Sequence, residues 1–195
     1  SASRHYVRIF RNSGWVVRFV ETGGVWAPQA NVKDTLTKDN GDWLYVMSSG
    51  DKEWFDTSGR LIRVLKADGR GITIDYSTLN VAVLTDDYGN IMTLNLDSSS
   101  RVISMTDPDS AEYKYKYNSN GELQYVSYPD NTPGEAGSNP WVENNPYREY
   151  HYDLTHAYLI TGITDENNDR YKTIKYDAQD RAIESGLSDG SIGKS

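Results

Sequence analysis

The sequence predicts an all-β protein, an array of antiparallel β-hairpins that form a curved, open, twisted sheet. A short phrase recurs about every 20 residues, which indicates stacked copies of one small unit. Several segments alternate aromatic or apolar residues with polar ones, the period of a half-buried strand. No long segment shows the 3.6-residue periodicity of an amphipathic helix.

The recurring phrase consists of an aromatic residue or Leu, then Asp or a substitute, a polar turn and a β-branched run. Its clearest copies are residues 55–61 (FDTSGRL) and 176–182 (YDAQDRA). We call the first residue of each copy the anchor; the anchors are Phe55, Tyr76, Leu96, Tyr117, Tyr152 and Tyr176. The first four anchors lie 21, 20 and 21 residues apart, and intervals of 35 and 24 residues follow. One long insertion therefore interrupts a regular array.

Each copy has the pattern of a β-hairpin. Residues 112–117 (EYKYKY) predict a strand, 118–121 (NSNG) a turn, and 123–128 (LQYVSY) the returning strand. The same pattern fits strands at 61–65 and 81–84, which are followed by turns at 67–70 and 86–90. A single hairpin is marginally stable in water, so we expect stacked neighbours to bury the anchor rings while Tyr hydroxyls reach water.

The Asp that follows an anchor is predicted to form the turn. We expect the carboxylates of Asp97, Asp153 and Asp177 to accept a backbone N–H two residues further on. Asn118 and Ser77 stand at the same place and are expected to make the same bond. Other copies have Ser110, Asn168 and Asp180 where the pattern has Gly, which predicts turns of a different type there.

Residues 1–50 are predicted to form irregular β-strands that precede the array. Strands are expected at 6–10, 15–20 and 43–47, with a looser stretch from Trp26 to Gly41. Residues 51–187 form the repeat array, which contains an insertion loop at 129–147. Trp141 and Tyr147 are expected to pin this loop to the body. Residues 188–195 are predicted to be a flexible tail.

Composition excludes several classes of protein. The net charge of −8 argues against a general nucleic-acid binder. There is no Cys for disulfides or thiolate metal sites, no apolar run long enough to span a membrane, and no visible signal peptide. The first strands carry Arg4, Arg8, Arg11 and Arg18, which fit either a solvated strand face or contact with an acidic neighbour.

No catalytic, cofactor-binding or metal-binding residue is predicted, and we expect the chain not to be an enzyme. His5, His151 and His156 lack a partner at metal-ligand spacing, so a surface or turn role is expected. Residues 165–169 (DENND) lack the Gly and Glu of an EF-hand and predict a hairpin turn. A weak cation site there or at 107–109 (DPD) is the alternative. The pair Asp86 and Asp87 and the run 98–100 (SSS) are assigned to turns.

Residues 55–61, 102–109, 125–130, 159–168 and 176–183 resemble the YD repeats of bacterial Rhs proteins. The resemblance covers roughly residues 41–187; residues 1–40 do not match clearly, and the C-terminal core signature of the family is missing. It implies a segment of a large secreted or cell-surface protein, a polymorphic toxin. In that family the repeats form a β-shell that encloses a C-terminal toxin used in competition between cells, so the resemblance implies that this chain is a slice of a β-shell.

Two functions follow as hypotheses. The first is a structural repeat segment whose partners are the neighbouring repeats of the same parent chain. Its unpaired edge strands would promote an edge-mediated homo-oligomer of the isolated fragment. The second is an extracellular module that binds carbohydrate or a cell surface, with Trp141 at the rim of the 129–147 loop.

Overall fold

The computed structural model describes residues 5–29, 31–129, 146–187 and 192–194. The chain divides into two compact units, an N-terminal unit, Ser1–Ile91, and a C-terminal unit, Met92–Ser195. Within each unit, successive strands pair in antiparallel fashion, and the described residues contain no helix. The predicted fold, an all-β open array of antiparallel hairpins, is therefore confirmed.

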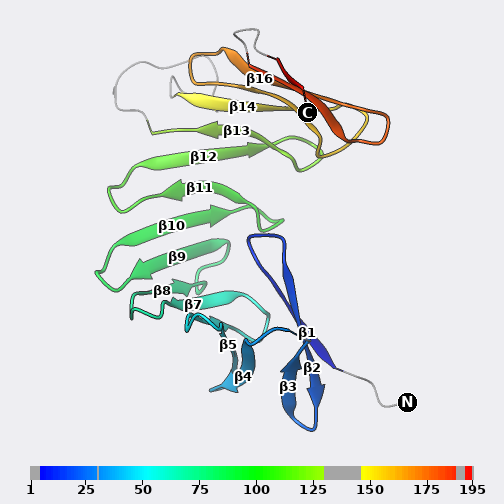
Figure 1. The fold of residues 1–195 in the computed structure, drawn as a ribbon. Helices are drawn as coiled ribbons and strands as arrows, with labels where there is room; N and C mark the ends of the chain where they lie inside the picture. The colour runs from blue at the N-terminus through cyan, green and yellow to red at the C-terminus, as the bar shows by residue number, and fades with distance from the viewer. Residues whose placement is uncertain (1–4, 30, 130–145, 188–191, 195) are drawn as a thin grey trace. The chain divides into compact units, whose positions relative to one another are not determined.

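The N-terminal unit is a meander in which each strand pairs with the next one along the chain (Figure 1). Its strands are β1 (Tyr6–Phe10), β2 (Val16–Thr22), β3 (Val25–Pro28), β4 (Thr35–Asp39), β5 (Asp42–Val46), β6 (Lys52–Phe55), β7 (Leu61–Leu65), β8 (Gly71–Asp75) and β9 (Val81–Asp86). The strands predicted at 6–10, 15–20, 43–47, 61–65 and 81–84 are confirmed to within two residues at either end.

The looser stretch predicted from Trp26 to Gly41 is wrong, because β3 and β4 lie within it. Gly23 and Gly24 both have positive φ and join β2 to β3 through a two-residue loop. Asn40 and Gly41 join β4 to β5 in the same way. Two successive positive φ angles match the right-handed twist of a hairpin, so both dipeptides are signals for tight hairpins.

The core of the N-terminal unit lies between its first strands and β4–β5. The buried residues are Ile9, Val17, Phe19, Leu36 and Tyr45, and Trp26, Trp43 and Phe55 pack against them. The sheet folds back on itself where β3 and β4 meet, since only the pair Trp26 and Leu36 joins them. The Phe19 and Tyr45 rings then meet edge to face at 6.1 Å.

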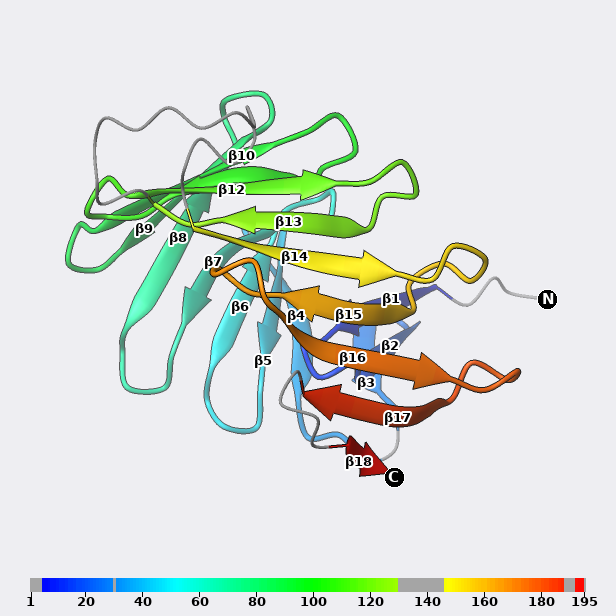
Figure 2. The ribbon, with the colours of Figure 1, turned by 90° about the horizontal axis from the view of Figure 1, so that it is seen from above.

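The C-terminal unit continues the same hairpin pattern. Its strands are β10 (Ile91–Leu96), β11 (Val102–Thr106), β12 (Glu112–Tyr117), β13 (Leu123–Ser127), β14 (Tyr147–Tyr152), β15 (Ile160–Thr164), β16 (Arg170–Tyr176), β17 (Ala182–Leu187) and β18 (Ile192–Lys194). Strands β12 to β17 lie side by side (Figure 2). The strands predicted at 112–117 and 123–128 are β12 and β13, the latter one residue shorter.

Part of the predicted insertion loop and tail lies outside the described residues. Residues 130–145, which include Trp141, and residues 188–191 and 195 are not described. Tyr147 begins β14. Residues 192–194 of the predicted tail form β18 and pair with β17.

We expect Phe19→Ala to lower the unfolding free energy of the N-terminal unit by about 3–5 kcal/mol, because Phe19 is fully buried and its removal leaves a cavity. Urea denaturation followed by Trp fluorescence measures this loss of unfolding free energy, since four of the five Trp residues lie in this unit. Phe10→Ala is the matched control, since Phe10 is 70% exposed, and it should cost less than about 1 kcal/mol. Equal losses in both variants would contradict this position of the core.

Candidate functional site

The repeated feature that links sequence to architecture is a five-residue turn, here called the repeat turn. It begins at Asp56, Asp86, Asp97, Asp107, Asn118, Asp165 and Asp177. In every copy the first residue donates its N–H to the carbonyl of the fifth, and the fourth donates to the carbonyl of the first. The side-chain oxygen of the first residue accepts the N–H groups of the third and fifth residues at 2.8–3.0 Å.

The prediction that turns without Gly differ in type is wrong. The fourth residue has positive φ in every repeat turn, from Gly59, Gly89 and Gly121 to Ser100, Ser110, Asn168 and Asp180. The hydrogen bonds are the same in all of them. The four bonds of the turn thus hold non-Gly residues in the left-handed region, which they otherwise avoid.

The predicted roles of the turn carboxylates are mostly confirmed. Asp97, Asp177 and Asn118 accept the expected N–H two residues on, and so does Asp153 from Thr155 in a longer loop. The role predicted for Ser77 is wrong. Ser77 is a donor, and the acceptor is Asp75, which precedes the anchor instead of following it.

Hydrogen bonds to the ionised carboxylates of Asp86, Asp97 and Asp177 lower the pKa values of these three residues. For Asp97 the backbone N–H of Arg101 is the largest cause and its guanidinium the next, so the pKa lies below the ordinary value. For Asp177 the Arg181 guanidinium is the largest cause of a lowered pKa. In the Asp86 turn the side chain of Asn90 has this role. The turns therefore favour carboxylates that are charged at neutral pH.

The anchors are half-buried, so the expected burial of their rings is only partial. A β-bulge lies immediately before Phe55, Leu96, Tyr117, Tyr152 and Tyr176, where each strand passes into its turn.

The hydroxyls of three Tyr anchors bond to the protein, whereas the prediction was that they reach water. Those of Tyr117, Tyr152 and Tyr176 donate to the carbonyls of Val102, Leu123 and Ile160, at 2.8–2.9 Å, in the preceding hairpin. Each Tyr anchor thus ties its repeat to the one before.

In three of the repeat turns the fifth residue links the turn to the next repeat. Arg60 bonds Asp56 in its own turn and lies over the ring of the next anchor, Tyr76, at 4.7 Å. Arg101 does the same with Asp97 and Tyr117, at 4.6 Å. Glu122 stands at this position in the Asn118 turn.

Glu122 is buried and makes the link through a different bond. Its carboxylate accepts the Asn118 side-chain amide within the turn and the backbone N–H of Tyr158 in the next loop. These hydrogen bonds lower the pKa of Glu122, and the bond from the Asn118 side chain is the largest cause. A cation and an anion thus occupy the same position and both join consecutive repeats.

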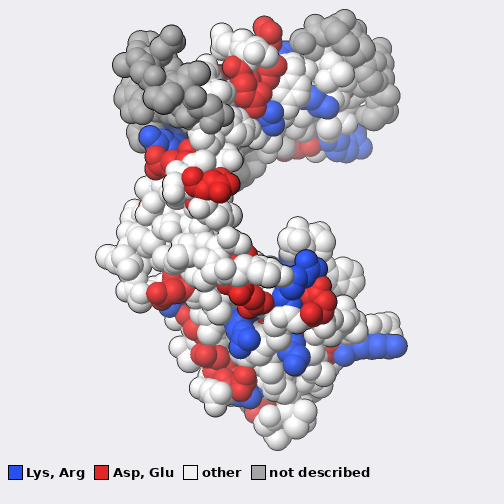
Figure 3. All heavy atoms as spheres, turned by 90° about the vertical axis from the view of Figure 1, so that its left-hand side faces the viewer, with Lys and Arg blue, Asp and Glu red and all other residues white. Residues whose placement is uncertain are grey.

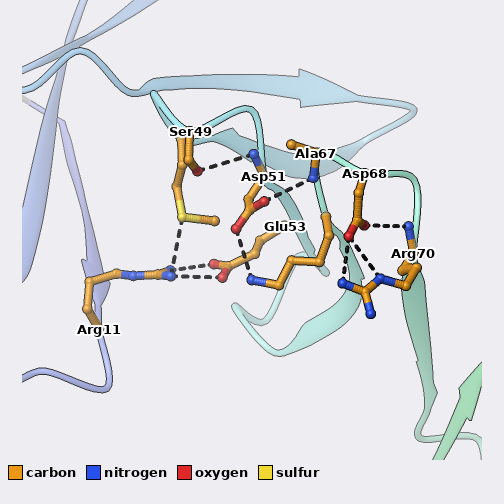
Figure 4. A network of polar contacts seen from close by, with 9 residues as sticks. Arg11, Ser49, Asp51, Glu53, Ala67, Asp68 and Arg70 are labelled. Atoms are coloured by element: carbon orange, nitrogen blue, oxygen red, sulfur yellow. Dashed lines mark hydrogen bonds and ion pairs between the residues drawn. The ribbon is translucent and has the colours of Figure 1, made fainter.

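The turns on the other side of the N-terminal unit are linked by carboxylates. Asp51 accepts the backbone N–H of Ala67 at 3.0 Å and forms an ion pair with Lys66 (Figure 4). Both partners lie in the next turn on that side. In the same way, the Asp87 carboxylate accepts the backbone N–H of Gly71. Both sides of this unit therefore carry contacts between successive turns.

A buried ion pair joins β6 to the turn that follows β1. Arg11 donates two hydrogen bonds to Glu53, at 2.5 and 2.9 Å, and one to the sulfur of Met47 (Figure 4). Glu53 is 9% exposed. The bond to Glu53 is the largest cause that raises the pKa of Arg11, which stays charged.

Each of the three histidines makes local contacts. His5 bonds Glu21 at 3.0 Å, and His151 bonds Thr164 at 2.7 Å while burial lowers the pKa of His151. His156 donates its backbone N–H to the Asp153 carboxylate at 2.9 Å, and its ring contacts the Thr155 hydroxyl. Residues 165–169 and 107–111 form repeat turns, as predicted for the first of them. Across the described ranges, no group of three or more His, Cys, Asp or Glu is placed to hold a metal ion.

Charge is interspersed on the face that Figure 3 shows, where acidic and basic side chains alternate in small groups over each unit. A continuous basic surface for nucleic acid is not seen on that face. Among the described residues there is no helix with the length and hydropathy to cross a membrane.

An open cavity of about 510 Å³ lies in the N-terminal unit beside Trp15, which is 65% exposed. Asp34 lines it and is held by Tyr45 and by the Ser48 N–H at 2.9 Å. Burial and this contact raise the pKa of Tyr45. The side chains of Asn12 and Asn31 also line the cavity. The cavity can offer hydrogen bonds and a ring face.

Comparison with known proteins gives no assignment. No family model matches the chain, and no curated protein matches it either.

Ser100→Gly should raise the unfolding free energy of the C-terminal unit by about 0.5–1 kcal/mol, because Gly relieves the strain at φ 62°. Urea denaturation followed by circular dichroism measures the change. Ser99→Gly is the matched control one residue earlier; it adds chain freedom without relieving strain and should be destabilising. If both variants shift stability in the same direction, the conformation of the fourth turn residue is not the cause.

The stabilisation from the carboxylates of Asp97 and Asp177 should be present above about pH 4, the ordinary pKa of Asp in an unfolded chain, and be lost as pH falls through the lower folded values. Asp97→Asn keeps the acceptor, as native Asn118 shows, but does not titrate. We therefore expect a smaller loss of unfolding free energy between about pH 5 and pH 2 than in the native chain. Asp97→Ala, which removes the acceptor, should be the less stable variant at pH 7. An unchanged acid slope in Asp97→Asn would contradict this.

Proposed function

We propose that this chain is a structural repeat segment of a large secreted or surface-delivered protein of the Rhs type. In this role its hairpins contribute to a β-shell that encapsulates a C-terminal toxin used in competition between cells. The chain itself carries out no catalysis and needs no cofactor. Its partners are the neighbouring repeats of the parent chain.

The observation that supports the proposal is that contacts between neighbouring repeats recur along the chain. Arg60 and Arg101 bond their own turn and stack on the next anchor, and three Tyr anchors donate backward to a carbonyl. An array whose repeats contact their nearest neighbours can be extended in one dimension, which suits a wall. The resemblance of residues 41–187 to YD repeats supplies the more specific part of the proposal, the enclosed toxin.

Limited proteolysis of the parent protein, expressed with the sequence that flanks this chain, tests the proposal. A downstream domain inside a shell should resist protease while the repeats are intact and become sensitive when it is expressed alone or when the repeats are opened with urea. A downstream domain that is cleaved at the same rate in the parent protein and in isolation would contradict encapsulation.

The alternative, an extracellular carbohydrate-binding module, is favoured by the cavity beside Trp15. An exposed ring with polar neighbours suits a sugar, which presents both a C–H face and hydroxyls. Trp141, on which the sequence-based version of this alternative depends, lies outside the described residues. A glycan array separates the two functions, since a purely structural segment gives no specific signal.

A further inference from the structure

We propose that the cavity beside Trp15 binds a neutral saccharide, whose ring lies against the indole of Trp15 and whose adjacent hydroxyls donate to the carboxylate of Asp34. The proposal rests on the carbohydrate-binding alternative above and makes its ligand and its site specific. It is carried by the preformed walls of the cavity, by the acceptor capacity of Asp34 and by the balance of charge in the lining.

Two five-residue turns form part of the walls. In the turn at 11–15, Arg11 donates its N–H to the carbonyl of Trp15 at 2.8 Å, and Gly14 donates to the carbonyl of Arg11 at 3.0 Å. The turn at 47–51 contains the same two bonds. All residues that line the cavity belong to the N-terminal unit. Because backbone bonds fix both turns, their side chains are in place before a ligand arrives, as is usual in small-molecule sites.

Trp15 gives the cavity an exposed ring. It is the fifth residue of its turn, the position from which Arg60, Arg101 and Glu122 contact the next repeat in their own turns. In this turn the position holds an indole that is 65% exposed and lines the cavity. An indole offers a large apolar face on which the C–H face of a sugar ring can pack.

Asp34 is a fixed acceptor that has capacity for further hydrogen bonds. One carboxylate oxygen accepts the hydroxyl of Tyr45, a buried residue, and the other accepts the backbone N–H of Ser48 at 2.9 Å. An ionised carboxylate has about four lone-pair sites, so each oxygen of Asp34 can accept one more hydrogen bond. Two hydroxyls on adjacent carbons of a sugar match this pair of oxygens.

The size of the cavity and its other polar groups also suit a sugar. The volume of about 510 Å³ lies within the roughly 300–1,000 Å³ of small-molecule sites. Asn12, Asn31 and Ser13 line the cavity, and their side chains can both donate to and accept from a hydroxyl. A saccharide presents many hydroxyls that donate and accept, whereas an apolar ligand of the same size would leave these groups without partners.

The charges in the lining favour a neutral ligand. Arg11 and Lys33 both line the cavity, but the guanidinium of Arg11 is paired with Glu53 through two hydrogen bonds. The charge of Lys33 is offset by that of Asp34, the next residue. An acidic sugar would bring its carboxylate toward Asp34, and an amine would approach two cations, so either ligand meets a like charge. A neutral saccharide meets no such repulsion.

A glycan array incubated with the full chain tests the ligand class. The probes are neutral oligosaccharides of glucose, galactose, mannose or N-acetylglucosamine, and the matched comparisons carry a uronic acid in place of one neutral sugar. We expect a neutral glycan to bind and its acidic counterpart to bind about tenfold or more weakly. Acidic glycans that bind as well as their neutral counterparts would overturn the neutral ligand but not the carbohydrate-binding alternative. An array on which no glycan binds would overturn both.

Variants of the cavity test the site by titration calorimetry with the neutral glycan that gives the strongest signal. Trp15→Ala should weaken binding about tenfold or more, because it removes the ring on which the sugar packs. Phe10→Ala is the matched control, since Phe10 is 70% exposed but does not line this cavity, and it should bind like the native chain. Unchanged affinity in Trp15→Ala, or an equal loss in Phe10→Ala, would overturn the site.

Asp34→Asn tests the acceptor, with circular dichroism confirming that the variant is folded. It replaces one acceptor oxygen by a donor and removes the negative charge. We expect weaker binding of the neutral glycan and a smaller difference between this glycan and its acidic counterpart. Native affinity and native discrimination in this variant would contradict the role of Asp34.

Discussion

The structure depends on a carboxylate or amide oxygen that accepts two backbone N–H groups inside a five-residue turn. This oxygen satisfies donors that a strand end leaves free, and it fixes the turn so that the fourth residue takes a left-handed conformation. As a result, the two strands of each hairpin pair in a fixed register, and a bulge places the anchor beside the turn. Once the register is fixed, the anchor hydroxyl and the fifth turn residue reach adjacent hairpins.

The two units use this geometry to different extents. In the N-terminal unit the first strands fold over β4 and β5 and bury Phe19 and Tyr45, so a conventional hydrophobic core exists there. The described part of the C-terminal unit has few fully buried residues, and the ones it has include Glu122, Ser127 and Thr164. Hydrogen bonds and half-buried rings between neighbours carry more of its cohesion. The pKa of Tyr125, raised to about 12 by burial and by its bond to Glu149, shows how polar these contacts are.

Much of the fold follows from the sequence because it is local. Alternation in residues 112–117 and the turn residues after them determine a hairpin without reference to distant contacts. The predictions were wrong where a turn was not recognised in the sequence. Gly23 with Gly24 and Asn40 with Gly41 are tight-turn dipeptides, and recognising them would have placed β3 and β4. The role of Asp75 was missed because the acceptor at this copy lies two residues earlier, relative to the anchor Tyr76, than in the other copies.

Contacts between distant segments could not be predicted in this way. The pairing of Arg11 with Glu53 and the cavity beside Trp15 depend on how the first strands fold back, which no periodicity encodes. Nor does the repeat pattern reveal that Arg60 and Arg101 bridge consecutive copies, since both could equally have faced solvent.

The bridging geometry has a consequence for how such chains change over time. In the copies that begin at Phe55 and Leu96, the fifth turn residue supplies a guanidinium and the next anchor supplies the ring that receives it. Duplicating or deleting a stretch that keeps such a guanidinium and the following ring together therefore leaves the link matched. Arrays of this kind can lengthen or shorten by whole repeats without new compensating substitutions, whereas a change of a few residues would break the match.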